Sequence, residues 1–337
     1  MASRWRSVPT YLASIVIVVG AGVGYLAWQA RRANLALEAS FRRSLGGRSY
    51  PERFRKTEDN ATVRSLETLG CEIGLEMAQP KGPGACHPSL LAKRRFEKVK
   101  AALNESFNPR KVAEDGSLAP RSAEVAAYLT ASRPTLDRVR NVLLSSPPVA
   151  WKLDLTEGWG GKVPNTIGFM HLDTLLLARA REEVRNGDRE AALSNLEAAW
   201  RYNQAVLDSP LLIAQMAGES MTQRQLIVLR SLADAPEPWP RRLMALDLRG
   251  RLSIGFRTEA FMTYQTAAVD RPPPDAPIQP WWLARRFLRD HARRFEAMIA
   301  EMERRDIRSF DPDEFSREMN GRIPRWQIAS RFLLPDH

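Results

Sequence analysis

The chain has 337 residues, of which 44% are hydrophobic and 26% are charged, so its composition is that of a folded globular protein and excludes a disordered chain. A formal net charge of +11 raises nucleic acid and anionic membrane surfaces as partner classes. The arginines are interleaved with acidic residues, as over 179–190, which indicates solvated helix faces and argues against nucleic acid as a partner.

The N-terminal region predicts a membrane anchor. A short basic tail, residues 1–8, precedes an uncharged apolar stretch at residues 9–28. A helix of that length spans about 30 Å, which matches the hydrocarbon core of a bilayer. A cleaved signal peptide is the alternative, since Arg4 and Arg6 form a basic start, but the apolar run continues to Trp28 beyond the small residues that a cleavage site would use. We therefore expect an uncleaved transmembrane helix with the lipid bilayer as its partner.

Two glycines in this segment suggest a contact between copies of the chain. Gly20 and Gly24 are four residues apart and share one helix face, where a second helix could approach closely. This spacing predicts a homodimer contact within the membrane. The alternative interpretation is that glycine is simply common in membrane helices.

The side of the membrane is argued from charge and from cysteine. Basic residues flank both ends of the apolar stretch, and the positive-inside rule alone would place the C-terminal side in the cytoplasm. A short basic tail is, however, typical of an anchor whose N-terminus stays inside while the rest of the chain is exported. Cys71 and Cys86 lie fifteen residues apart, and a disulfide between them would fit an oxidising compartment. Two unpaired thiols are the alternative. Together these features favour an extracytoplasmic body.

The rest of the chain predicts a mainly α fold. Residues 29–58 read as a juxtamembrane helix and linker, and residues 59–337 as an α-helical body, subdivided near the proline-rich segments 233–240 and 270–280. No strand pattern of any length is present, so we expect an irregular array of α-helical hairpins. Helices are expected at about 59–77, 89–103, 121–131, 135–144, 166–184, 189–207, 210–232, 241–268, 281–305 and 312–320.

The clearest local signal is a helical hairpin centred on Gly187 and Asp188. Glycine can adopt the left-handed conformation that ends one helix, and aspartate can cap the next one. With Ala191 (or Ala192) and Leu193, these residues resemble the start of the second helix in tetratricopeptide repeats. The resemblance covers one unit of about 40 residues, and no second copy follows at the usual period of the repeat.

More broadly, the chain resembles a group of uncharacterised bacterial membrane-anchored helical proteins. The resemblance rests on the N-terminal anchor, the Asn60-Ala61 helix start, the Gly187-Asp188 hairpin and the helix that begins Leu212-Ile213-Ala214-Gln215. It implies a protein of the bacterial inner membrane with a periplasmic body. It implies no known activity.

One motif suggests an enzyme. Residues 104–109, Asn-Glu-Ser-Phe-Asn-Pro, resemble the Glu-Ser-x-Phe-x-Pro start of lytic transglycosylases, in which the glutamate is the catalytic acid. One residue is missing between Ser106 and Phe107, and the downstream glycine-rich run of that family is absent. A cell-wall-directed glycan hydrolase that uses Glu105 is therefore the alternative function.

No other catalytic, cofactor or metal site is indicated. The histidines lack ligand spacing, and no phosphate-binding loop or nucleophile–base pair is legible. We expect a membrane-anchored helical interaction or scaffold protein that is not an enzyme, needs no cofactor and binds a protein partner.

Overall fold

The computed structural model describes scattered positions between 25 and 52 and the continuous ranges 56–77, 86–107, 122–160, 164–232 and 236–268. Apart from Tyr25 and Trp28, the predicted anchor at residues 9–28 lies outside the described residues. Gly20, Gly24 and the helices predicted after residue 268 lie outside them as well. Among the helices that are described, none combines the length and the apolar character needed to cross a bilayer.

The prediction of a mainly α fold is confirmed for the described residues, in which the one β feature is an isolated antiparallel bridge between Thr57 and Leu153. These residues form the α-helices α3 (Ala61–Glu72), α4 (Leu90–Ser106), α5 (Ala123–Ser145), α6 (Thr166–Arg185), α7 (Arg189–Asp208), α8 (Leu212–Arg230), α9 (Trp239–Met244) and α10 (Leu248–Ala268), and the 3₁₀ helix η2 (Leu155–Gly160).

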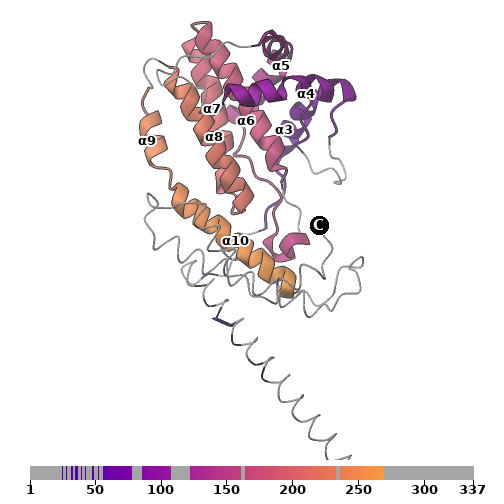
Figure 1. Cartoon of the computed structure of the whole chain (residues 1–337), viewed down its shortest axis with the longest axis vertical. Coiled ribbons are helices and arrows are strands. Elements are labelled where there is room, and N and C mark those ends of the chain that lie inside the picture. The colour runs from indigo at the N-terminus through magenta and orange to yellow at the C-terminus, as the bar shows by residue number, and fades with distance from the viewer. Residues whose placement is uncertain are drawn as a thin grey trace, which may run out of the picture.

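Helix α6 is the centre of the core. It contacts α4, α5, α7 and α8, and these helices surround it in Figure 1. Leu175, Leu176 and Leu177 are all fully buried, which explains three consecutive leucines in a helix that has no solvent-facing side at this level. Burial extends to charged residues in the last turns of α6, where Arg179 and Glu183 form an ion pair with each other.

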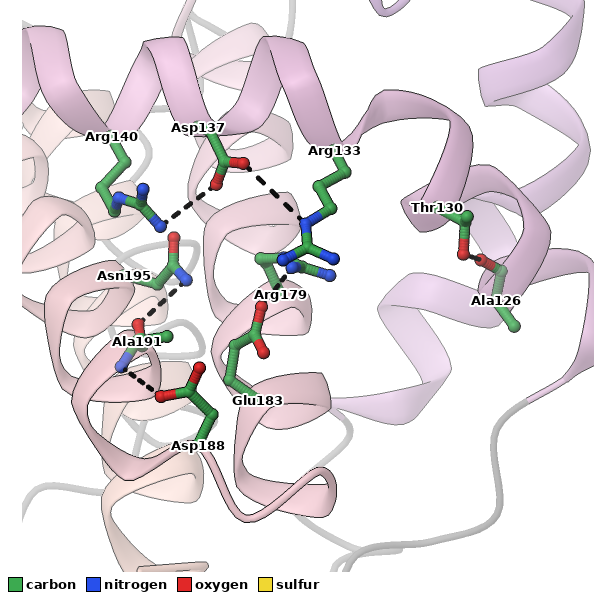
Figure 2. A network of polar contacts seen from close by, with 10 residues as sticks. All are labelled: Ala126, Thr130, Arg133, Asp137, Arg140, Arg179, Glu183, Asp188, Ala191 and Asn195. Atoms are coloured by element: carbon green, nitrogen blue, oxygen red, sulfur yellow. Dashed lines mark hydrogen bonds and ion pairs between the residues drawn. The ribbon is translucent and has the colours of Figure 1, made fainter.

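The turn between α6 and α7 is formed by Gly187 and Asp188. Gly187 has a φ of 76°, and its N–H donates to the carbonyl of Val184 at 3.1 Å. The N–H of Asp188 donates to the carbonyl of Glu183 at 2.9 Å, which completes a Schellman motif. The Asp188 carboxylate then accepts the N–H of Ala191 at 3.0 Å and caps α7, as Figure 2 shows. Local backbone chemistry therefore determines the hairpin.

The predicted break between 121–131 and 135–144 is wrong, because α5 runs as one helix through Pro134. A proline inside a helix removes one backbone hydrogen bond and costs about 3 kcal/mol. Leu129 before the proline and Leu136 and Val139 after it are all buried in the core. Their burial on one continuous face offsets that cost.

The predicted single helix at 241–268 is also wrong, since residues 245–247 separate α9 from α10. The carboxylate of Asp247 accepts the N–H of Gly250 at 2.9 Å and so starts a new helix. In Figure 1, α10 lies across one end of the bundle, where it contacts α8 and η2. There the Glu259 carboxylate accepts the N–H of Leu212, the first residue of α8, and burial raises the pKa of Glu259 to about 7.

Candidate ligand-binding groove

A groove of about 410 Å³ lies between the segment that follows α5, the outer face of α7 and the short helix α9. Its volume falls within the range of roughly 300–1,000 Å³ that is usual for ligand pockets. The groove is lined by Thr62, Leu143, Ser146, Pro147, Pro148, Val149, Glu197, Trp200, Arg201, Gln204, Ala205, Asp208 and Arg242.

The apolar part of the groove is built around Trp200. Its ring meets that of Trp239 edge to face, with ring centroids 5.6 Å apart and an angle of 83° between the planes. The guanidinium of Arg242 lies over the other tryptophan, Trp239, at 5.1 Å from the ring centroid. Both tryptophans are buried, so these contacts fix α9 against α7 and place Arg242 at the groove.

The polar part is built around Glu197. One of its carboxylate oxygens accepts from Nε of Arg201 at 3.2 Å, and the other pairs with Arg242. Arg201 also donates from Nη1 to the carbonyl of Leu144 at 2.6 Å, which joins α7 to the end of α5. Two arginines and two acidic residues, Glu197 and Asp208, leave the lining electrically balanced.

One polar atom of a groove-lining residue has no partner among the described residues. The Nε2 of Gln204 is buried and forms no hydrogen bond to any of them. A buried donor without an acceptor is costly, and a rotation of the Gln204 side chain into the groove would let a ligand carbonyl satisfy it. The groove therefore offers an apolar surface and a charged rim, which is binding chemistry, with the Gln204 amide beside them. Its lining contains no nucleophile paired with a base.

The wall formed by residues 147–149 is held by the start of the described body. Nδ2 of Asn60 donates to the carbonyl of Pro148 at 2.8 Å, and Oγ1 of Thr62 donates to that of Pro147 at 3.0 Å. The N–H of Asn60 also donates to the carbonyl of Ala150 at 3.1 Å. Two prolines restrict the backbone of this segment as well. The wall is therefore held in place by hydrogen bonds within the body.

A second polar cluster lies in the core, where α6, α7 and α8 meet. Nε2 of Gln225 donates to Asp173 at 3.3 Å, and Nδ2 of Asn203 donates to Oγ1 of Thr222 at 2.8 Å. Burial raises the pKa of Asp173 to about 8. Burial also raises the pKa of Tyr202, with the charges of Asp173 and Glu67 as smaller causes. The cluster residues are fully buried, so this cluster contributes to stability and specificity rather than to a ligand site.

None of the residues singled out from the sequence lines the groove. Cys71 and Cys86 are joined by a disulfide at the end of α3, and Gly187 and Asp188 form the α6–α7 turn. Glu105 is exposed in the last turn of α4, so the burial that a catalytic acid needs is missing and the hydrolase alternative gains no support.

The histidines and acidic residues form no metal site in the described part of the chain. His171 is half-buried, its ring centroid lies 5.1 Å from that of Phe96, and burial lowers its pKa to about 4.

Sequence reasoning missed the groove, although part of its signal was present. Glu197, Trp200, Arg201 and Gln204 recur at spacings of three and four residues, which places a tryptophan on the polar face of α7. A large aromatic side chain on the polar face of a helix indicates a binding surface. The contribution of Arg242 from α9 depends on tertiary packing and has no local signal.

Comparisons of the chain with protein-family models, with curated proteins and with solved structures found no match.

Proposed function

We propose that this chain is a single-pass membrane-anchored interaction protein whose helical body binds a short segment of a partner protein in the groove beside Trp200. The observation that carries the proposal is the groove itself, whose lining combines Trp200 with Gln204, a residue whose amide nitrogen bonds to no described residue. The anchor is the apolar stretch 9–28, and the disulfide between Cys71 and Cys86 supports a periplasmic body at the bacterial inner membrane.

A peptide suits this groove better than a highly charged ligand. Glu197 pairs with both Arg201 and Arg242, and together with Asp208 it balances their charge, so the lining attracts neither strong anions nor strong cations. An extended segment would place one apolar side chain on Trp200 and one backbone carbonyl on Gln204. In this proposal the α6–α7 hairpin is of the tetratricopeptide type, and such helical hairpins commonly present surfaces to other proteins.

Photo-crosslinking of the full-length protein in its own membranes tests the groove. A photoreactive phenylalanine analogue at Ser146 should give one discrete adduct with a protein partner, because Ser146 lines the groove and its replacement leaves Trp200 and Gln204 intact. The same analogue at Thr130, which is exposed on α5, should not give that adduct. The measurement is the mass and the identity of the adduct after irradiation.

A groove-filling change provides the second control. Ala205 lines the groove and is half-buried against the core, so Ala205→Phe should fill the space and remove the Ser146 adduct, at a cost of about 1–3 kcal/mol in the free energy of unfolding. Circular dichroism should show that this variant is still folded. Equal adducts from Ser146 and Thr130, or an adduct that survives Ala205→Phe, would refute binding in the groove.

The proposed side of the membrane is tested by a fusion after residue 50. A reporter enzyme that is active only outside the cytoplasm should be active there, and a reporter that fluoresces only in the cytoplasm should be dark. The reverse pattern would place the body in the cytoplasm and remove the compartment argument for the disulfide. Dimerisation through Gly20 and Gly24 remains a separate prediction of the sequence.

A further inference from the structure

Helix α4 turns an unusual face to solvent. Leu90 and Leu91 are neighbours in the first turn and are 75% and 60% exposed, whereas leucine is among the residues most often buried in folded proteins. Arg94, Arg95 and Lys98 are exposed on the following turns of the same helix. Spacings of three, four and seven residues from Leu91 place these three cations on one side of α4 with that leucine. We refer to these five residues as the outer face of α4.

The opposite side of α4 fixes this orientation. Phe96, Val99 and Leu103 are buried, and the ring of Phe96 meets that of Tyr128 with centroids 6.2 Å apart. A rotation of the helix that buried Leu90 and Leu91 would therefore expose the three buried side chains of the opposite side. In Figure 1, α4 lies at the edge of the bundle, so its outer face is presented away from the core.

No described residue neutralises the cations of the outer face. Lys93 pairs with Glu76 at 2.7 Å and Lys100 pairs with Glu97 at 3.4 Å, so these neighbours are satisfied. Arg94, Arg95 and Lys98 form no ion pair with any described residue. Three charges that no described residue pairs with, beside two exposed leucines, match the chemistry of a partner that is both anionic and apolar.

A further exposed apolar residue lies near the same end of the body. Glu76, which binds Lys93 of α4, also accepts through its carbonyl from Nδ2 of Asn165 at 2.6 Å. Asn165 caps α6, and Ile167 in its first turn is 65% exposed. The first turns of α4 and α6 thus border one loop and both carry exposed aliphatic side chains.

We propose that the outer face of α4 docks on the anionic lipid surface of the bilayer. The inference rests on the proposed function, since it takes the body to be held close to that bilayer. Arg94, Arg95 and Lys98 contact lipid phosphates while Leu90 and Leu91 enter the headgroup boundary, which is the combination used by interfacial helices. A nucleic acid would use the cations but would leave the leucines in water.

The length of the tether permits this contact. Between Trp28, where the predicted anchor ends, and Thr57, where the body begins, lie 28 residues. Described positions in its first half, among them Arg32 and Leu35, are helical, whereas Arg48 and Lys56 are not, so the chain can bend after its helical part and α4 can turn to the membrane. Docking would hold the body flat against the bilayer instead of leaving it to swing on its tether.

The experiment uses the full chain in vesicles. Leu91→Cys provides a single reactive thiol, because Cys71 and Cys86 are paired in the described structure. After reconstitution, the thiol is labelled with a membrane-impermeant, environment-sensitive dye, so that only outward-facing bodies report. We expect a blue shift in vesicles with about one third phosphatidylglycerol, no shift in pure phosphatidylcholine, and loss of the shift at high salt.

Charge-matched variants identify the surface. Neutralising the outer face with Arg94→Gln, Arg95→Gln and Lys98→Gln should lower the ratio of docked to free body on the order of 100-fold. Each lost cation contributes a factor of roughly five to this decrease. The control neutralises three exposed arginines on other helices, Arg133→Gln, Arg230→Gln and Arg241→Gln, and should keep the shift.

Two results would overturn the proposal: an unshifted dye in anionic vesicles, or an equal loss in both triple variants. A failure of the anchor can be distinguished from a failure of docking by flotation in a density gradient, since a protein without a working anchor would not float with the vesicles.

Discussion

We expect Asp173→Asn to change the free energy of unfolding in a pH-dependent way. The difference between the variant and the natural protein should be about 5 kcal/mol more favourable to the variant at pH 8 than at pH 4. Asp173 is completely buried, and its second carboxylate oxygen has no hydrogen-bond partner among the described residues. Asparagine has nearly the same shape, keeps an acceptor for Gln225 and carries no charge. The substitution therefore removes the ionisation without leaving a cavity.

The sign follows from the two pKa values. Burial raises the pKa of Asp173 from 3.8 in the unfolded chain to about 8 in the folded protein. Between these values the folded state holds a proton that the unfolded state has released. The free energy of unfolding therefore falls by about 1.4 kcal/mol per pH unit as the pH rises through this window. Below pH 3.8 both states are protonated and the effect vanishes.

Urea unfolding of both proteins between pH 4 and pH 8 measures this effect. Subtracting the two curves cancels the other buried groups, among them His171, whose lowered pKa makes acid destabilising, and Glu259, whose raised pKa acts in the same direction as that of Asp173. A difference between Asp173→Asn and the natural protein that does not change with pH would show that Asp173 is ionised in the fold.

The second large effect is expected at Gly74, where Gly74→Ala should cost about 3 kcal/mol or more. Gly74 has a φ of 90°, which L-residues other than glycine rarely adopt. A Cβ there would also contact the carbonyl oxygen of Ala92 and lie 2.7 Å from its carbonyl carbon. Both atoms belong to the backbone of α4, so the helix itself would have to move away from residues 73–77.

Gly187 provides the matched control, since its φ is 76° but no described atom lies within 4 Å of the position that a Cβ would take. Gly187→Ala should therefore cost only the conformational penalty of about 1 kcal/mol. Thermal and urea unfolding of the two variants measure the conformational penalty, from Gly187→Ala, and the added cost of the contact with Ala92, from the difference between the variants. Equal costs at the two positions would show that the contact with Ala92 relaxes freely.

The features predicted correctly from the sequence depend on local chemistry. The mainly α fold of the described residues follows from helical periodicity, and the boundaries of α6 and α7 and the start of α3 follow from capping residues and a glycine. The α6–α7 turn is the clearest example, because Gly187 and Asp188 each serve a backbone group within four residues.

The failures arise where tertiary packing overrides local preference. Pro134 is a helix breaker by itself, yet burial of Leu129 and Leu136 keeps α5 continuous. The groove combines residues from four separate segments between Thr62 and Arg242. Its lining could be anticipated only on α7, where Trp200 stands among polar residues at helical spacing.

The hydrogen bonds that shape the groove wall also give the body a mechanical property. Thr57, Asn60 and Thr62 hold the segment 147–153, and they are the first residues of the continuous body. A force that pulls on the chain before Thr57 would therefore load these few, largely exposed bonds ahead of the buried contacts of α6. Under tension the wall beside Trp200 would yield before the core helices separate, so the shape of the groove depends on the load carried by the tether.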